Sequence, residues 1–137
     1  MPSRQRIAAY GVCVDAAGRL LLARAAPSIS LRGRWFLPGG GVDHGESPAD
    51  AVRREIQEEA GLTVELGPLL DVVSDVRMLP DETSLHTVRV IYRVASWTGT
   101  LRAETDGTTD AVRWVPREEL STLPLAFYVE DIVERFA

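Results

Sequence analysis

The segment from Ser47 to Gly61 constrains this chain more than any other part of its sequence. Ser47 is a good N-cap, Pro48 suits the first position of a helix, and Asp50 stands where the acid of a capping box would stand. Gly61 follows the last helical residue, as a left-handed C-cap does. The pattern predicts a helix from Pro48 to Ala60.

One side of this helix is apolar and an acidic face lies beside it. Glu55, Glu58 and Glu59 are related by i, i+3 and i+4, so their carboxylates share a face. Each close pair of like charges costs on the order of a few kcal/mol at an effective dielectric constant of about 20. Arg54 can offset one charge, and a solvated acidic face is the alternative. We expect a hard divalent cation with oxygen ligands. The apolar stripe consists of Ala49, Val52, Ile56 and Ala60.

A longer motif surrounds the three glutamates. It reads Gly, five residues, Glu, seven residues, Arg-Glu-apolar, any residue, Glu-Glu, any residue, Gly-apolar. The positions are filled by Gly40, Glu46, Arg54, Glu55, Ile56, Glu58, Glu59, Gly61 and Leu62. This motif resembles the Nudix box at every fixed position, and residues 35–40 resemble the family's usual lead-in.

The resemblance to Nudix hydrolases implies both a fold and an activity. The implied fold is α+β, a Nudix-type α/β/α sandwich with a central mixed β-sheet, built by residues 1–137 as one domain. The implied activity is metal-dependent hydrolysis of a pyrophosphate bond in a nucleoside diphosphate derivative, by attack of water on phosphorus. A nucleoside triphosphate and a nucleotide sugar such as ADP-ribose are both candidate substrates. The alternative is a catalytically silent Nudix-like domain that binds or senses a nucleotide.

The resemblance also implies roles for the residues of the box. Glu55, Glu58 and Glu59 are the expected ligands of Mg²⁺, or of Mn²⁺ in its place, and one of them is a candidate general base. Glu46 is expected as an outer metal contact, and Gly40 is counted with the metal site.

Arginine carries every basic charge of this chain, because all 15 basic residues are Arg and no lysine is present. Arginine or a metal must therefore do any cationic work. The family resemblance implies that Arg54, within the box, orients Glu55 or Glu58 without touching substrate. Arg24 resembles a position at which relatives hold substrate phosphate or sugar, and Arg34, in the loop before the box, is expected to reach substrate phosphate. A solvated arginine is the alternative for each.

A further carboxylate is expected on the loop of residues 101–110. Many Nudix relatives place a glutamate on this loop as a metal ligand or general base, and Thr108 stands at that position here. Glu104 is our first candidate for the missing catalytic carboxylate, ahead of Asp106 and Asp110. The alternative is that the acids of the box suffice.

Alternation and turn residues predict the remaining elements. Residues 7–14 and 19–24 are expected to form a hairpin around a turn at 15–18. Further strands are expected at 35–37, 63–75, 86–97 and 111–115, a helical turn at 116–120, and a closing amphipathic helix at 125–136.

Composition narrows the class of protein. A hydrophobic fraction of 45% and a charged fraction of 26% are typical of a soluble globular domain. The net charge of −5 argues against non-specific binding to nucleic acid or to an anionic membrane. No apolar run approaches the roughly 20 residues of a membrane span, and no signal peptide is evident. Cys13 is the only cysteine. We expect a cytoplasmic monomer or homodimer, and the absence of Lys and Asn suggests a bacterial, high-GC genome.

Overall fold

A computed structural model describes residues 2–26, 33–103 and 109–137, with the side chains of residues 109 and 110 left undescribed. No helix in these ranges is long and apolar enough to cross a membrane. The strands are β1 (Ser3–Val12), β2 (Leu20–Ala25), β3 (Trp35–Phe36), β4 (Gly39–Gly41), β5 (Thr63–Met78), β6 (Ser84–Thr98) and β7 (Thr109–Val115). The helices are α1 (Pro48–Ala60), the 3₁₀ helix η1 (Arg117–Thr122) and α2 (Val129–Phe136).

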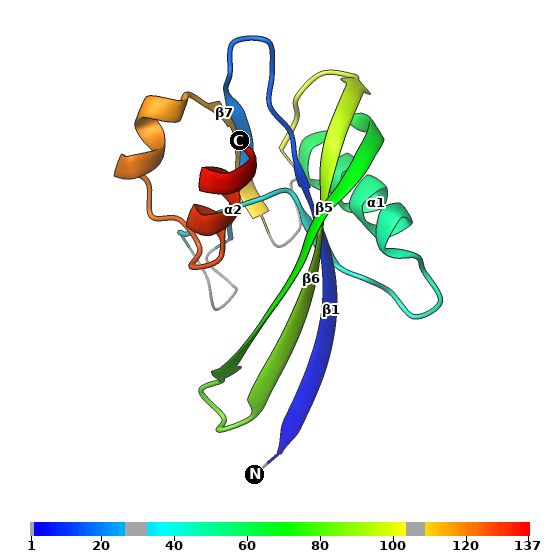
Figure 1. The fold of residues 1–137 in the computed structure, drawn as a ribbon, viewed down its shortest axis with the longest axis vertical. Coiled ribbons are helices and arrows are strands. Elements are labelled where there is room, and N and C mark those ends of the chain that lie inside the picture. Colours follow the sequence, from blue (N-terminus) through cyan, green and yellow to red (C-terminus); the bar gives the residue numbers. More distant parts are fainter. Residues whose placement is uncertain (1, 27–32, 104–108) are drawn as a thin grey trace.

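The strands form two sheets in the middle of the molecule (Figure 1). The larger sheet has the order β4-β1-β6-β5, in which β1 and β6 are parallel and both outer pairs are antiparallel. The smaller sheet has the order β3-β2-β7 and is antiparallel. The mixed sheet is therefore confirmed, but a second, smaller sheet accompanies it.

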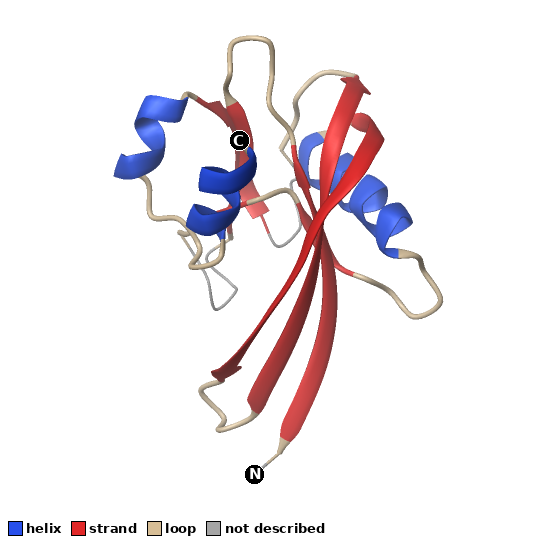
Figure 2. Ribbon diagram, viewed as in Figure 1, coloured by secondary structure: helices blue, strands red, loops and turns tan. Residues whose placement is uncertain are grey.

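Helices cover the sheets on both sides (Figure 2). Successive side chains of β1 point to opposite faces. Ala9 belongs to the apolar cluster that contains Ile56 of α1, whereas Ala8 belongs to the cluster that contains Ile132 of α2. The β2 residues Leu21 and Leu22 divide between the same two clusters. The result is the expected α/β/α sandwich, with α1 on one side and η1 and α2 on the other.

Helix α1 begins and ends as its sequence predicts. The Ser47 side chain accepts a hydrogen bond from the backbone N–H of Asp50 at 3.1 Å. Gly61 ends the helix in the left-handed conformation with φ of 73°. The Asp50 carboxylate accepts a hydrogen bond from Arg53 at 3.0 Å. Within the predicted apolar stripe Ala49 is only half-buried, and the buried positions are Ala51, Val52, Ile56, Glu59 and Ala60.

The expected hairpin between the first two strands is largely absent. Apart from a bridge between Val14 and Leu20, and a hydrogen bond from Leu21 N–H to Cys13 C=O at 2.9 Å, β1 and β2 belong to different sheets. The prediction was wrong because β1 already has β4 on one edge and β6 on the other. The turn itself forms, since the Asp15 carboxylate accepts hydrogen bonds from two backbone N–H groups after it.

Three strands extend further than their sequences indicated. They run together beyond the helices and form an arm, here defined as residues 3–7 of β1, 74–78 of β5 and 84–88 of β6 (Figure 1).

The closing helix is shorter than expected, because it begins at Val129 and not at residue 125. Phe127 is exposed, and Tyr128 is the aromatic residue buried against the core.

Candidate active site

The three glutamates of the box differ in exposure, because α1 turns them progressively away from the core. Glu59 is buried, with 2% of its surface exposed. The side chain of Glu55 is 17% exposed and that of Glu58 is 51% exposed. The acidic face therefore runs from the packed interior to solvent along the edge of the apolar stripe.

The glycines of β4 bring backbone against these acids. The Glu59 carboxylate accepts a hydrogen bond from the backbone N–H of Gly39 at 2.8 Å. A Cβ atom on Gly40 would lie 2.8 to 3.0 Å from the three carboxyl atoms of Glu55. Glycine at position 40 is thus required for Glu55 to occupy its place against β4.

Arg54 connects three of the acids. Its guanidinium makes two hydrogen bonds to Glu46, at 2.9 and 3.0 Å, and one to Glu55 at 3.0 Å. It also lies 3.4 Å from Glu58 and donates to the carbonyl of Gly41 at 3.1 Å. The hydrogen bond to Glu46 is the main reason that the pKa of Arg54 is raised, and it lowers the pKa of Glu46.

The box acids offer only oxygen donors, which is the ligand chemistry of Mg²⁺ and Mn²⁺. Within the described ranges, no three His, Cys, Asp or Glu side chains already converge as a metal site. Glu55 is nevertheless held against the β4 backbone, and the Glu58 side chain is 51% exposed to solvent. The donor chemistry of these residues fits a hard divalent cation.

A cleft of about 360 Å³ begins at this acidic face and extends along the arm. Glu55 and the β4 glycines line one end, and arginines line much of the rest. Its volume lies within the range of about 300–1,000 Å³ that is usual for small-molecule sites. The residues that line the cleft include Arg4, Arg6, Gly40, Glu55, Arg77 and Arg89.

Arg89 forms part of the wall of this cleft. It is 4% exposed and donates a hydrogen bond to Asp75 on the neighbouring strand β5. Its guanidinium also lies 4.3 Å from the ring centre of Tyr128 and 5.2 Å from that of Phe127. Burial raises the pKa of Tyr128, so this wall carries a neutral phenol and a charge-paired arginine.

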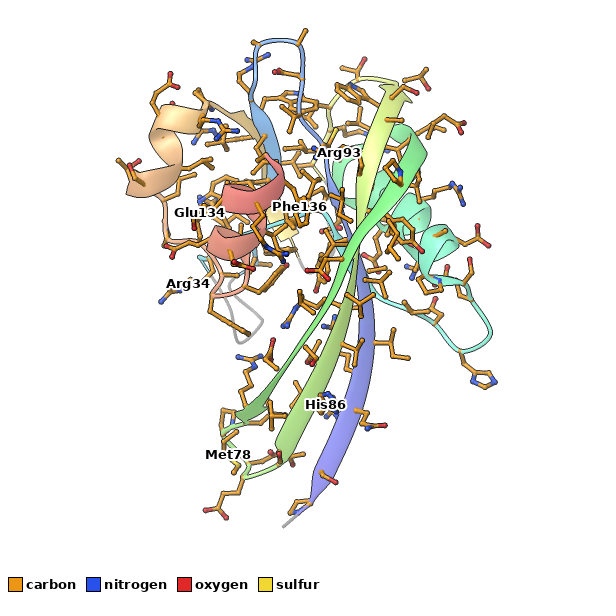
Figure 3. All side chains as sticks on the ribbon, in the orientation of Figure 1. Arg34, Met78, His86, Arg93, Glu134 and Phe136 are labelled. Carbon is orange, nitrogen blue, oxygen red and sulfur yellow. The ribbon has the colours of Figure 1, made fainter. Side chains whose placement is uncertain are left out.

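The arginines expected to bind substrate do not line the cleft. The Arg24 guanidinium lies 5.6 Å from the ring centre of Trp35. Arg34 donates a hydrogen bond to the backbone carbonyl of Leu125 at 3.3 Å and lies on the side of the molecule that contains α2 (Figure 3). Glu104, Asp106 and Thr108 lie outside the described residues, as does the side chain of Asp110.

The comparisons with known proteins agree with this geometry. The family model of the NUDIX domain matches residues 4–136. A MutT-like protein of Streptomyces ambofaciens is 32% identical over 120 residues, which cover 88% of this chain and 70% of the relative. The mouse 8-oxo-dGDP phosphatase NUDT18 is 32% identical over 105 residues, 75% of this chain, and the match spans only 30% of that relative's length. The crystal structure of a MutT NUDIX hydrolase from Burkholderia pseudomallei superposes with a TM-score of 0.83 at 29% identity, covering 98% of this chain and 99% of that one.

A fold of this topology, with the complete box around one helix, defines a domain of the Nudix class. The chain belongs to the Nudix hydrolase family.

Proposed function

We propose that this protein hydrolyses a pyrophosphate bond in a nucleoside diphosphate derivative and that a divalent metal ion is required. One observation carries the proposal: Glu55 lies where the acidic face of α1 meets an arginine-lined cleft large enough for a nucleotide. An acidic face alone would repel a pyrophosphate, and an arginine-lined cleft alone would bind it without reaction. Their junction supports a site that binds the anion and cleaves it.

The residues divide the work of the reaction between them. Glu55, Glu58 and Glu59 would hold the cation, and Arg54 positions Glu55 while its two hydrogen bonds to Glu46 fix the loop before α1. When bound, Mg²⁺, or Mn²⁺ in its place, would supply positive charge against the pyrophosphate and would lower the pKa of the attacking water. Water forms a new P–O bond, the bridging P–O bond breaks, and the leaving phosphate takes the bond's electron pair. A carboxylate of the box, or Glu104, accepts the proton of the water.

The names of its relatives narrow the panel of substrates. The mouse relative is named for a phosphatase activity on 8-oxo-dGDP. We therefore place oxidised and ordinary nucleoside di- and triphosphates first and nucleotide sugars second. A phosphate-release assay with Mg²⁺, Mn²⁺ or EDTA, followed by product identification, tests the proposal. Turnover should require the metal and release a nucleoside phosphate from at least one substrate.

Two adjacent arginines of α1 provide a matched control. Arg54 contacts the acids of the site, whereas Arg53 is paired with the exposed Asp50. Arg54→Gln should lower kcat by about tenfold to a hundredfold because Glu55 loses its positioning contact. Arg53→Gln should leave kcat within about twofold of the wild type. Nucleotide binding without metal-dependent turnover would indicate instead a domain that only senses nucleotides.

A further inference from the structure

The arm end of the cleft carries three arginines, of which two, Arg4 and Arg77, have no part in the proposed reaction. The register of the larger sheet pairs Arg4 of β1 with Leu85, and Leu85 with Arg77 of β5, so both arginines flank one residue of β6. Arg6 lies two residues further along β1 and thus on the same face. All three side chains line the cleft.

These arginines form no ion pair with a described carboxylate, although Arg4 is near enough to Asp81 to help lower the pKa of that carboxyl group. No described Asp or Glu oxygen lies within 4.0 Å of the guanidinium of Arg4, Arg6 or Arg77. In the same wall, Nε of the buried Arg89 has no hydrogen-bond partner among the described residues. The chain as a whole has a net charge of −5, so this cluster does not reflect general basicity. Like charges gathered on one concave face favour binding of an anion there.

Arg4 and Arg77 lie too far from the box to serve the pyrophosphate that is cleaved, whereas the Arg6 guanidinium reaches β4, 3.7 Å from the place of a Cβ atom on Gly41. Gly40 pairs with Ala9 of β1. Strands rise about 3.3 Å per residue, so Arg6 and Arg4 lie roughly 10 Å and 17 Å from that pair along β1. These are separations along the backbone, and the long arginine side chains close part of the gap, so their guanidinium groups can meet a phosphate that a ribose separates from the pyrophosphate.

We propose that the arm end of the cleft is a subsite for a second phosphate group of the substrate. This inference rests on the proposed function, which places the pyrophosphate at Glu55. The substrate class then becomes a nucleoside 5′-pyrophosphate compound that carries a further phosphate on its ribose. Guanidinium groups suit this role because they form paired hydrogen bonds to phosphate oxygens.

Ligands that differ only in one phosphate test the subsite directly. Calorimetry on the full chain with Mg²⁺ compares AMP with adenosine 2′,5′-bisphosphate and adenosine 3′,5′-bisphosphate. At least one bisphosphate should bind about tenfold to a hundredfold more tightly than AMP, as charge-assisted hydrogen bonds would give. Comparing the two bisphosphates shows which ribose position the subsite reads.

Variants assign that preference to individual arginines. Arg4→Gln and Arg77→Gln should each bring the affinity ratio of bisphosphate to AMP close to one while the affinity for AMP itself stays the same. Arg93→Gln is the matched control, because Arg93 also lies on the larger sheet without a described acid within 4.0 Å. Its side chain does not line the cleft and lies on β6 far from His86 of the arm (Figure 3). Thermal melts confirm that each variant is folded.

The outcomes separate this inference from the proposed function. Equal affinities for AMP and both bisphosphates would overturn the subsite, even if the protein hydrolyses pyrophosphates. Equal weakening of AMP and bisphosphate in both cleft variants would also overturn it, because the arginines would then hold the base or the 5′-phosphate. A bisphosphate preference lost in the cleft variants, in a protein that hydrolyses nothing on the panel, supports the subsite and refutes the proposed hydrolysis.

Discussion

Replacing Gly40 by alanine should separate catalysis from folding. A Cβ atom at this position would lie 2.8 Å from Cδ of Glu55, whereas ordinary contact begins at 3.4 Å. The carboxyl group must therefore retreat by about 0.6 Å. Because the group that yields is the end of a flexible side chain, the free energy of unfolding should change by less than about 1 kcal/mol.

The effect on activity should be much larger than the effect on stability. A misplacement of about 1 Å in a catalytic site can lower a rate by roughly a hundredfold. Gly40→Ala should thus lower kcat by about tenfold to a hundredfold at saturating Mg²⁺. Metal-dependent phosphate release gives the rate, and urea denaturation gives the free energy of unfolding.

The two neighbouring glycines serve as controls on the same strand. A Cβ on Gly41 would have its nearest contact at 3.7 Å, from Arg6, so Gly41→Ala should resemble the wild type. Gly39 has φ of 144°, and its Cβ would lie 2.7 Å from Cα of Tyr10 and closer still to the carbonyl of Ala9. Gly39→Ala should therefore destabilise the fold by several kcal/mol, on the order expected for backbone strain with a clash. If folded Gly40→Ala protein works as fast as Gly41→Ala protein, the placement of Glu55 does not control the reaction.

Three further outcomes are expected. Glu58→Gln should lower kcat by about 10²-fold or more. The free energy of unfolding should not fall, since the change removes one charge from three carboxylates that repel one another. A variant with more than about half of wild-type activity would contradict this expectation. Cys13 should resist alkylation at pH 8 until urea is added, because burial raises the pKa of its thiol to about 12. The unfolded thiol ionises first, so stability should fall as the pH rises from 9 toward 12. Glu104→Gln should lower kcat by roughly 10²- to 10⁴-fold with metal affinity intact, whereas Asp106→Asn and Asp110→Asn should matter far less; near-wild-type rates for all three would leave the base on α1.

The sequence was most informative where local rules decide the structure. The caps at Ser47 and Gly61 set the ends of α1, and the i, i+3, i+4 spacing placed Glu55, Glu58 and Glu59 on one face. These features depend on residues a few positions apart. The order of the elements and the sandwich followed from the same kind of pattern together with the family resemblance.

The cleft could not be predicted, because it depends on pairing between distant strands. Arg4 and Arg6 show the i, i+2 spacing of one strand face, but the first strand was expected to begin only at Ile7. Likewise, Arg77 lies beyond Asp75, where the strand that became β5 was expected to end. Polar residues obscured both strand ends, and cross-strand hydrogen bonds extend the strands all the same. The i, i+2 pair was the one local signal that pointed to the arginine cluster.

Under the proposed function, the glycine strand β4 explains why the cation would be needed on only one side of the site. At β4 the Glu55 carboxyl group packs where a side chain of Gly40 would be, while Arg6 lies 3.7 Å from the place of a Cβ on Gly41. An acid from α1 and an arginine from β1 thus approach adjacent residues of the same strand. Under the proposed function, a pyrophosphate lying across β4 meets repulsion from the glutamates and attraction from the arginine. On the glutamate side, a bound cation must reverse the negative charge before the pyrophosphate can bind. On the arginine side, the positive charge of the arginine binds the pyrophosphate directly.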